Sequence, residues 1–148
     1  MTTYYSNELA GTTTGLTTSP EASIRPSAEK GYFARVKNFR ATITYAAQAA
    51  GSVFRLAVIP PGMTFISGTM VSDTDTDTTT FAIGSDRTSS TSYKTAITLT
   101  QHTPVTFGRS VANTGAFTAE EKIYMTTAVK ALPESGTLVF DILCASAN

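Results

Sequence analysis

The chain has 148 residues, equal numbers of basic and acidic side chains (11 of each) and a formal net charge of zero. That length suits one domain, which can bury a hydrophobic core without needing disulfide bonds or a structural metal. The lack of a basic excess argues against a protein whose main task is to neutralise a nucleic-acid backbone. Charged residues make up 15% of the chain, below the roughly 25% of an average domain, and 28 Thr and 14 Ser supply the missing polarity. Because β-branched Thr fits a pleated, half-exposed surface, this bias favours strands.

Cys144 is the only cysteine, which excludes an intrachain disulfide and a cysteine-based zinc site. It stands in an apolar C-terminal segment, so we expect a small buried hydrophobe. The N-terminus lacks the basic and apolar regions of a secretory signal, and no apolar run approaches the length of a transmembrane helix. We therefore expect no membrane partner and synthesis in a reducing cytoplasm.

Residues 1–31 are rich in Thr, Ser, Gly and Pro and sustain neither a strand period nor a helix period. They form either a disordered tail or an extended arm that orders on a partner. Pro20 and Pro26 bias their neighbours towards extended conformations, which suits an arm. We predict an arm over residues 1–31 and a β-sandwich domain over residues 32–148. The candidate partner-binding residues are Tyr4, Tyr5, Leu9, Leu16, Ile24, Arg25, Arg35 and Lys37.

The first strand is predicted within residues 32–48, where apolar and polar side chains alternate as in a half-buried antiparallel strand. Arg35 and Lys37 have the same parity as Phe39, so this charged end should leave the core or lie at a sheet edge. Together with Arg40, these two side chains form either solvated strand surface or a small basic patch that faces an acidic partner.

Three further strands follow in the stretch from Val53 to Gly84. Val53–Ile59 is apolar on both parities, which predicts a strand covered on both faces and ended by the Pro60–Gly62 turn. Thr64–Ser72 is the next strand, and Gly68 inside it predicts a bulge or close packing. Thr79–Ile83 is a short third strand.

Asp73, Asp75 and Asp77 alternate along the chain, which would place three carboxylates on one side as a possible calcium cluster. The EF-hand pattern would need Gly at position 78 and Glu at position 84, but the sequence has Thr78 and Gly84. We therefore favour a solvated, charge-marked turn that discourages edge-to-edge pairing.

The C-terminal half predicts four more strands. They are residues 93–100, 105–107, 123–129 and 137–144. In the third, Ile123, Met125 and Val129 share a face, and in the last, Asp141 needs a partner or an exposed position. About eight strands without a helix predict an all-β fold, a single antiparallel β-sandwich or jelly roll.

The sequence carries no catalytic motif: GxSxG, HExxH, a Walker loop and GxGxxG are all missing. We interpret His102, the one histidine, as a surface loop residue. Glu120 and Glu121 should point to opposite faces of a strand, which does not suit the paired carboxylates of a glycosidase. We predict no catalytic residue, no enzymatic activity and no cofactor.

Two blocks carry a family resemblance. The first is RLAVIPPGMTFISGTMVSD (residues 55–73) followed by TFAIGSDR (residues 80–87), and the second is KIYMTTAV (residues 122–129) followed by GTLVFDILCA (residues 136–145). The first resembles the strand, Pro/Gly turn, Gly-containing strand and Ile-Gly segment of small structural proteins from tailed-phage genomes. The second resembles their closing hairpin. The resemblance covers about residues 50–145, and it implies a β-sandwich or jelly roll that sits on virions as a capsid decoration (cement) or head-associated protein.

Two hypotheses follow from these observations. In the first, the chain is a virion protein that binds the major capsid protein on the outer surface as a symmetric homo-oligomer, a trimer, without contacting nucleic acid. Its arm would then dock on the shell or on a neighbouring copy. In the second, it is a head-fibre or tail-associated module that binds a host glycan. That site would need exposed aromatic side chains, and the candidates are Tyr4, Tyr5, Tyr32 and Tyr93.

Overall fold

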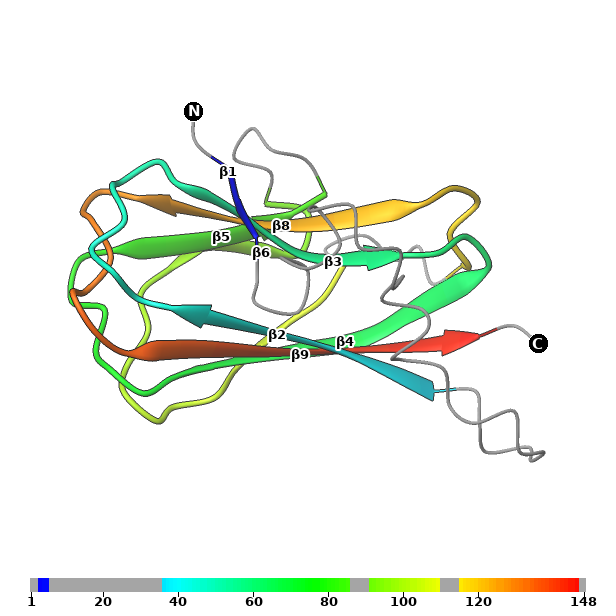
Figure 1. The fold of residues 1–148 in the computed structure, drawn as a ribbon. Coiled ribbons are helices and arrows are strands. Elements are labelled where there is room, and N and C mark those ends of the chain that lie inside the picture. Colours follow the sequence, from blue (N-terminus) through cyan, green and yellow to red (C-terminus); the bar gives the residue numbers. More distant parts are fainter. Residues whose placement is uncertain (1–2, 6–35, 86–90, 110–114, 147–148) are drawn as a thin grey trace.

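Residues 3–5, 36–85, 91–109 and 115–146 are described by a computed structural model, the first three by their backbone alone (Figure 1). They form nine strands and no helix, and so no helix with the length and hydropathy to cross a membrane. The strands are β1 (Thr3–Tyr5), β2 (Val36–Thr44), β3 (Val53–Ile59), β4 (Met63–Ser72), β5 (Thr80–Gly84), β6 (Lys94–Ile97), β7 (Val105–Phe107), β8 (Glu121–Ala128) and β9 (Thr137–Ser146).

The strands from β2 to β9 pair as one long folded hairpin. β5 pairs with β6, β4 with β7, β3 with β8 and β2 with β9, all antiparallel. Pairing of β4 with β9 and of β5 with β8 then closes this ribbon into two sheets, with the orders β1-β3-β8-β5-β6 and β2-β9-β4-β7. Figure 1 shows the sheets as two layers. This nested pairing is a jelly roll, which confirms the predicted all-β antiparallel sandwich. β1 adds a parallel fifth strand that was not predicted.

The core lies between the two sheets and follows from alternation along each strand. In β9 every second residue is fully buried: Leu138, Phe140, Ile142 and Cys144 are all 0% exposed. Each such apolar side chain contributes about 1.5–3 kcal/mol by leaving water. β2 alternates in the same way, and it lies at an edge of its sheet, where Lys37 is half-buried. Burial also raises the pKa of the Cys144 thiol to about 12, as expected for a buried hydrophobe.

Gly68 permits close packing between β4 and β7. A Cβ added at Gly68 would clash with the Phe107 ring, so one of the two would have to move. The close-packing prediction is therefore confirmed, whereas the bulge in β4 lies between Phe65 and Ser67. Aromatic rings fill the space around this contact, with Phe65 and Phe107 centroids 6.2 Å apart.

Val129 was predicted to share the buried face of Ile123 and Met125, and this was wrong. Ile123 and Met125 are buried in β8, but the strand ends at Ala128 and Val129 is 74% exposed. The backbone turns at this point: Lys130 N–H donates to Ala128 C=O (2.9 Å) around a φ of 73° at Val129. An i→i+2 hydrogen bond at this φ is the pattern of a classic γ-turn, which is rare and strained.

The two ends of the sandwich differ. One end, which we call the bonded end, gathers residues 45–52, 73–79, 98–104 and 129–136, the loops at the left in Figure 1. The described positive-φ residues other than glycine all lie there, one in each loop. They are Ala47 (50°), Asp77 (51°), His102 (56°) and Val129 (73°). At the opposite end lie the β3–β4, β5–β6 and β7–β8 connections and the start of β2.

Backbone hydrogen bonds join the four loops of the bonded end to one another. Two of these backbone bonds run from Leu132 N–H to Gln48 O (2.9 Å) and from Thr76 N–H to Leu99 O (3.0 Å). The side-chain hydroxyl of Thr79 adds a third link, donating from Oγ1 to Ala131 O (2.9 Å). Because each loop satisfies the backbone groups of another, the loops form one structural unit.

Candidate functional site

The outer faces of the two sheets differ in exposure. On the five-stranded sheet, the outward residues opposite the core include Val53, Ala82 and Tyr124, which are only 1%, 9% and 7% exposed. On the four-stranded sheet, the outward residues of β9 and most of those of β4 are half-buried, Ile66 is exposed, and those of β2 are mostly exposed. The outer face of the four-stranded sheet is therefore the broad sheet surface that is open to a partner.

Strand register arranges this open face in rows. The central row contains Arg40 of β2, Asp141 of β9 and Thr69 of β4, each directly opposite the next. Residues opposite each other in antiparallel strands have Cβ atoms roughly 5 Å apart, so the row places a cation beside an anion. Asn38 Nδ2 also donates to Asp141 Oδ1 (2.9 Å), which supplies the partner that Asp141 was predicted to need.

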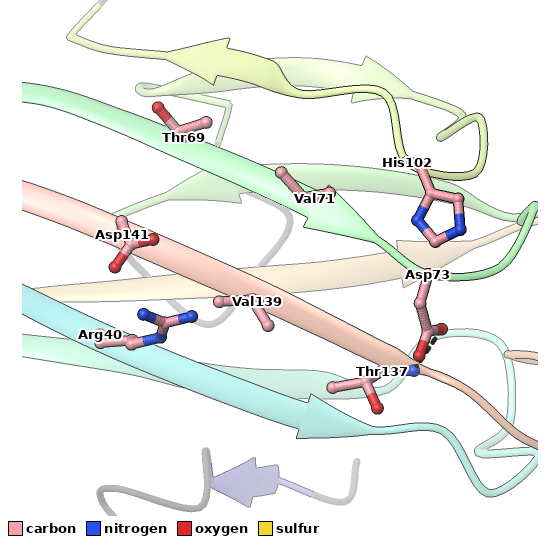
Figure 2. Close-up of a pocket in the computed structure, with 8 residues that line it drawn as sticks. All are labelled: Arg40, Thr69, Val71, Asp73, His102, Thr137, Val139 and Asp141. Carbon is pink, nitrogen blue, oxygen red and sulfur yellow. Dashed lines mark hydrogen bonds between the residues drawn. The ribbon is translucent and has the colours of Figure 1, made fainter.

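A shallow hollow of about 330 Å³ lies on this face, between the central row and the bonded end (Figure 2). Val71 and Val139 lie opposite each other in the register, between the charged central row and Asp73. The full lining consists of Arg40, Thr69, Val71, Asp73, His102, Thr137, Val139 and Asp141. Small-molecule pockets of this size are usually concave and mostly apolar. Here the hollow is open to solvent, and its two valines lie beside charged side chains.

Asp73 is held at the edge of the hollow by hydrogen bonds. Its Oδ1 accepts from the Thr137 backbone N–H (2.7 Å, dashed in Figure 2) and from Thr74 Oγ1 (2.9 Å). The Thr137 N–H, followed by Thr74, lowers the pKa of this exposed carboxyl below its usual range. Asp73 therefore stays ionised in mildly acidic solution and fixes the start of β9.

Asp75 and Asp77, the other members of the acidic ladder, contact different loops. Asp75 Oδ1 accepts from Gln101 N–H (2.8 Å), and Asp77 Oδ2 lies 3.4 Å from Lys130 Nζ. Within the described part of the chain, no group of three or more His, Cys, Asp and Glu side chains is placed to hold a metal ion. The exposed ladder thus connects the β4–β5 turn to three neighbouring segments.

The candidate arm residues fall mostly outside the described residues. The backbone of Tyr4 and Tyr5 forms part of β1, paired in parallel with Phe54 and Arg55. The side chains of these two tyrosines, and all of Leu9, Leu16, Ile24, Arg25, Tyr32 and Arg35, lie outside the description. These partner-binding assignments remain predictions.

Lys37 and Arg40, both proposed for a basic patch, lie on β2 with opposite parity. Lys37 shares the parity of inward-facing Phe39, whereas Arg40 is exposed on the open face. The strand therefore separates these two cations. Arg40 joins the hollow instead, where Asp141 is its cross-strand neighbour.

Tyr93, a candidate aromatic for glycan binding, is buried (4% exposed). Its hydroxyl donates to Glu121 Oε1 (2.8 Å), and its ring lies 5.0 Å from that of Phe65. Burial, followed by the hydrogen bond to Glu121, raises the pKa of Tyr93. Tyr93 thus belongs to the core and is unable to present its face to a sugar.

His102 is exposed in the β6–β7 loop, as predicted, and its backbone N–H donates to Ser72 O (2.8 Å). The predictions missed the other residues of the hollow, such as Thr69, Val71 and Val139. Their signal was present as parity, because Val139 has the same parity as Asp141 in β9. What the sequence lacked was the order of the strands.

Comparisons with known proteins identify the fold. No family model matches the sequence, and no curated protein matches it. A chain in the capsid of Ralstonia phage GP4 superposes with a TM-score of 0.62 and 20% identity, covering 76% of this chain and 85% of its own. A chain in the capsid asymmetric unit of cyanophage Pam1 gives 0.61 and 18%, covering 84% and 95%. A chain in the acid-stable capsid of Helicobacter pylori bacteriophage KHP30 gives 0.59 and 12%, covering 77% and 90%. At these identities the likeness establishes a shared fold.

Proposed function

We propose that the protein is a structural, non-enzymatic component of a phage virion that decorates the outer surface of the capsid and stabilises it by bridging neighbouring capsid subunits. One observation carries the proposal: the jelly roll is shared, over 85–95% of their length, with chains from three phage capsids. These shares imply matched chains of about 130 residues, each the size of one domain like this one. The sequence resemblance to cement and head-associated proteins supports the same role.

The physical properties of the chain suit this role. Zero net charge and a Thr-rich surface reduce the repulsion between copies that must lie close together. A symmetric oligomer, which we propose is a trimer, repeats the same contacts around a symmetry axis of the shell. Contacts that are individually weak then hold through multivalency. We propose the major capsid protein as the partner and the host cytoplasm as the place of synthesis.

Two parts of the chain are proposed to make the contacts. The first is the open face of the four-stranded sheet, centred on Arg40, Val139 and Asp141. Its alternating charges and half-buried valines resemble the rim and core of an ordinary protein interface. The second is the arm, residues 1–31, ahead of the sandwich domain of residues 32–148.

Binding to phage capsids that lack the protein tests the role of the open face. These capsids are incubated with the purified wild type, with Arg40→Glu and with Lys122→Glu, and the bound protein is measured after sedimentation. Lys122 is the matched control, an exposed cation on β8 of the other sheet whose contact with Glu120 (3.4 Å) is a surface ion pair. We expect Arg40→Glu to bind about tenfold more weakly and Lys122→Glu to bind like the wild type. Equal binding of both variants would rule out the open face.

The arm is tested by deletion of residues 1–31. Full binding of the remaining domain would refute arm docking, and a wild type that never binds the particle would refute the proposed function itself. Binding of the isolated domain to a glycan array would instead support a host-glycan module. A cryo-EM map of the decorated particle would give the symmetry position and copy number.

A further inference from the structure

One edge of the described five-stranded sheet is occupied by a very short strand. β1 has three residues, and it pairs in parallel with the first part of the seven-residue β3. The register places Thr3 beside Val53, Tyr4 beside Phe54 and Tyr5 beside Arg55. β3 is thus an acceptor edge for an added strand, and the bonds within this pair are main-chain bonds that do not depend on which copy supplies β1.

The chain between β1 and β2 is much longer than the gap that it crosses. β1 stops opposite Arg55, and β2 starts at Val36, at the end of the sandwich where β3 finishes. About four residues of strand length and one sheet spacing separate these points, roughly 15–20 Å. Five or six extended residues would span that distance, but residues 6–35 number thirty. Fully extended, thirty residues reach about 100 Å, farther than the width of a small domain.

Such a length allows the same strand to reach the β3 edge of another copy. The pairing contacts would be identical within a chain and between chains, so the two arrangements differ mainly in the entropy of closing the connection. A connection of thirty residues gives an effective concentration of the order of millimolar for its own edge. Copies held side by side on a shell present neighbouring edges at a comparable local concentration. Exchange of a short terminal element is a low-cost route to linked protomers.

We propose that, in the assembled particle, β1 of one copy pairs with β3 of a neighbouring copy, so that strand exchange links the copies. The partner is a second copy of this chain, and the site is the edge formed by residues 53–55. The proposal rests on the proposed function, because it needs many copies on one lattice. It assigns the arm to a neighbouring copy and leaves the open face of the other sheet for the shell.

Disulfide trapping tests this pairing. Thr3→Cys chains carrying a size tag and untagged Val53→Cys chains are co-expressed in equal amounts, loaded on particles and oxidised. Paired residues of adjacent strands lie about 5 Å apart at Cα, within the range of a disulfide. Exchange predicts a tagged–untagged heterodimer that contains about half of the Thr3→Cys chains, since neighbours are drawn at random. Each variant oxidised alone is the control, and the native Cys144 is fully buried.

A second pair, Tyr5→Cys with Arg55→Cys, guards against a local folding defect at Val53. Both cysteines of each pair are also introduced into the same chain. Cross-links found only within single chains would overturn the exchange, and so would the absence of any cross-link from either pair.

Deleting residues 12–29 leaves twelve connecting residues, about 40 Å, which is enough for β1 to reach the β3 edge of its own chain. This deletion should shift cross-links from between chains to within chains. Particle binding of the reduced variants is measured first, so that loss of binding counts against the proposed function and binding without exchange counts only against this inference.

Discussion

The two ends of the sandwich use the backbone in different ways. At the bonded end, four loops carry one strained residue each and are joined by hydrogen bonds from loop to loop. At the opposite end, the β3–β4 turn is short, Gly62 faces open space, and the long segment of residues 6–35 enters β2. Figure 1 shows the start of β2 and the C-terminus together at the right, away from the bonded end.

We infer from this difference that the bonded end stabilises the sandwich and that the opposite end is available for contacts. Strained conformations persist only where the surroundings over-determine them, and the cross-linked loops provide such surroundings. We infer that the bonded end holds the register of both sheets, including the hollow on the open face. The opposite end contributes chain length, which the proposed arm uses to reach partners.

The largest expected effect on stability comes from replacing a glycine at each end of the sandwich, Gly136 at the bonded end and Gly62 at the opposite end. Both have positive φ, but a Cβ at Gly136 would lie 2.5 Å from Thr74 Oγ1, whereas a Cβ at Gly62 would meet nothing within 4 Å. We expect Gly136→Ala to lower the free energy of unfolding by about 3 kcal/mol, from strain plus overpacking. Gly62→Ala should cost about 1 kcal/mol, from strain alone. Urea denaturation measures both, and equal losses would remove the distinction between the ends.

The next effect concerns a buried hydroxyl at the bonded end. Thr76 is 2% exposed, and its Oγ1 accepts from Leu99 N–H (2.8 Å). Thr76→Val keeps the shape but leaves that buried N–H without its acceptor, so we expect a loss of about 1–3 kcal/mol.

The matched control is Ser92→Ala at the opposite end. Ser92 Oγ accepts from Ser85 N–H (3.1 Å) in a hydrogen bond that water reaches and can replace, so the loss should stay below about 0.5 kcal/mol. Thermal unfolding measures the loss of stability in Thr76→Val and in Ser92→Ala. A larger loss of stability in Ser92→Ala would contradict the proposed difference between the two ends.

A substitution that relieves backbone strain at the bonded end should increase stability. Val129 is a β-branched residue at a φ of 73° and is exposed, so its side chain contributes little packing to offset the strain. Val129→Asn places a residue that tolerates this conformation, and we expect a gain of about 1 kcal/mol. The urea midpoint of this variant should rise, and Ala128→Asn, at the neighbouring strand position, should give no gain.

The smallest expected effect is a pH dependence at the bonded end. Hydrogen bonding lowers the pKa of Asp73 in the folded state, so its contribution to stability is present above the ordinary carboxyl pKa and is lost as pH falls through the lowered value. Stability should therefore decrease below about pH 4, and Asp73→Asn should remove that part of the decrease. Urea midpoints at pH 5 and pH 3 test this, and an unchanged pH slope in Asp73→Asn would refute it.

Local pattern predicted the elements well where one face of a strand is buried. The alternation around Phe39, the Pro60–Gly62 stop and the close approach at Gly68 all follow from single-strand chemistry. Parity failed at Val129, because a period of two does not indicate where a strand ends, and the γ-turn that ends β8 carries no glycine signal. Tyr93 was wrong as a candidate for glycan binding, because it is buried against Phe65 and hydrogen-bonded to Glu121, residues of other strands.

The sequence by itself determined that this chain is neutral overall and forms an all-β fold. Its Thr content, strand periods and turn residues are local properties that need no knowledge of neighbours. Only the tertiary structure decided which strands are adjacent, that the face around Arg40 and Asp141 is open, and that Thr3–Tyr5 pairs with β3. Strand order is set by contacts between residues far apart in the chain, and alternation within a strand contains no record of which strand lies beside it.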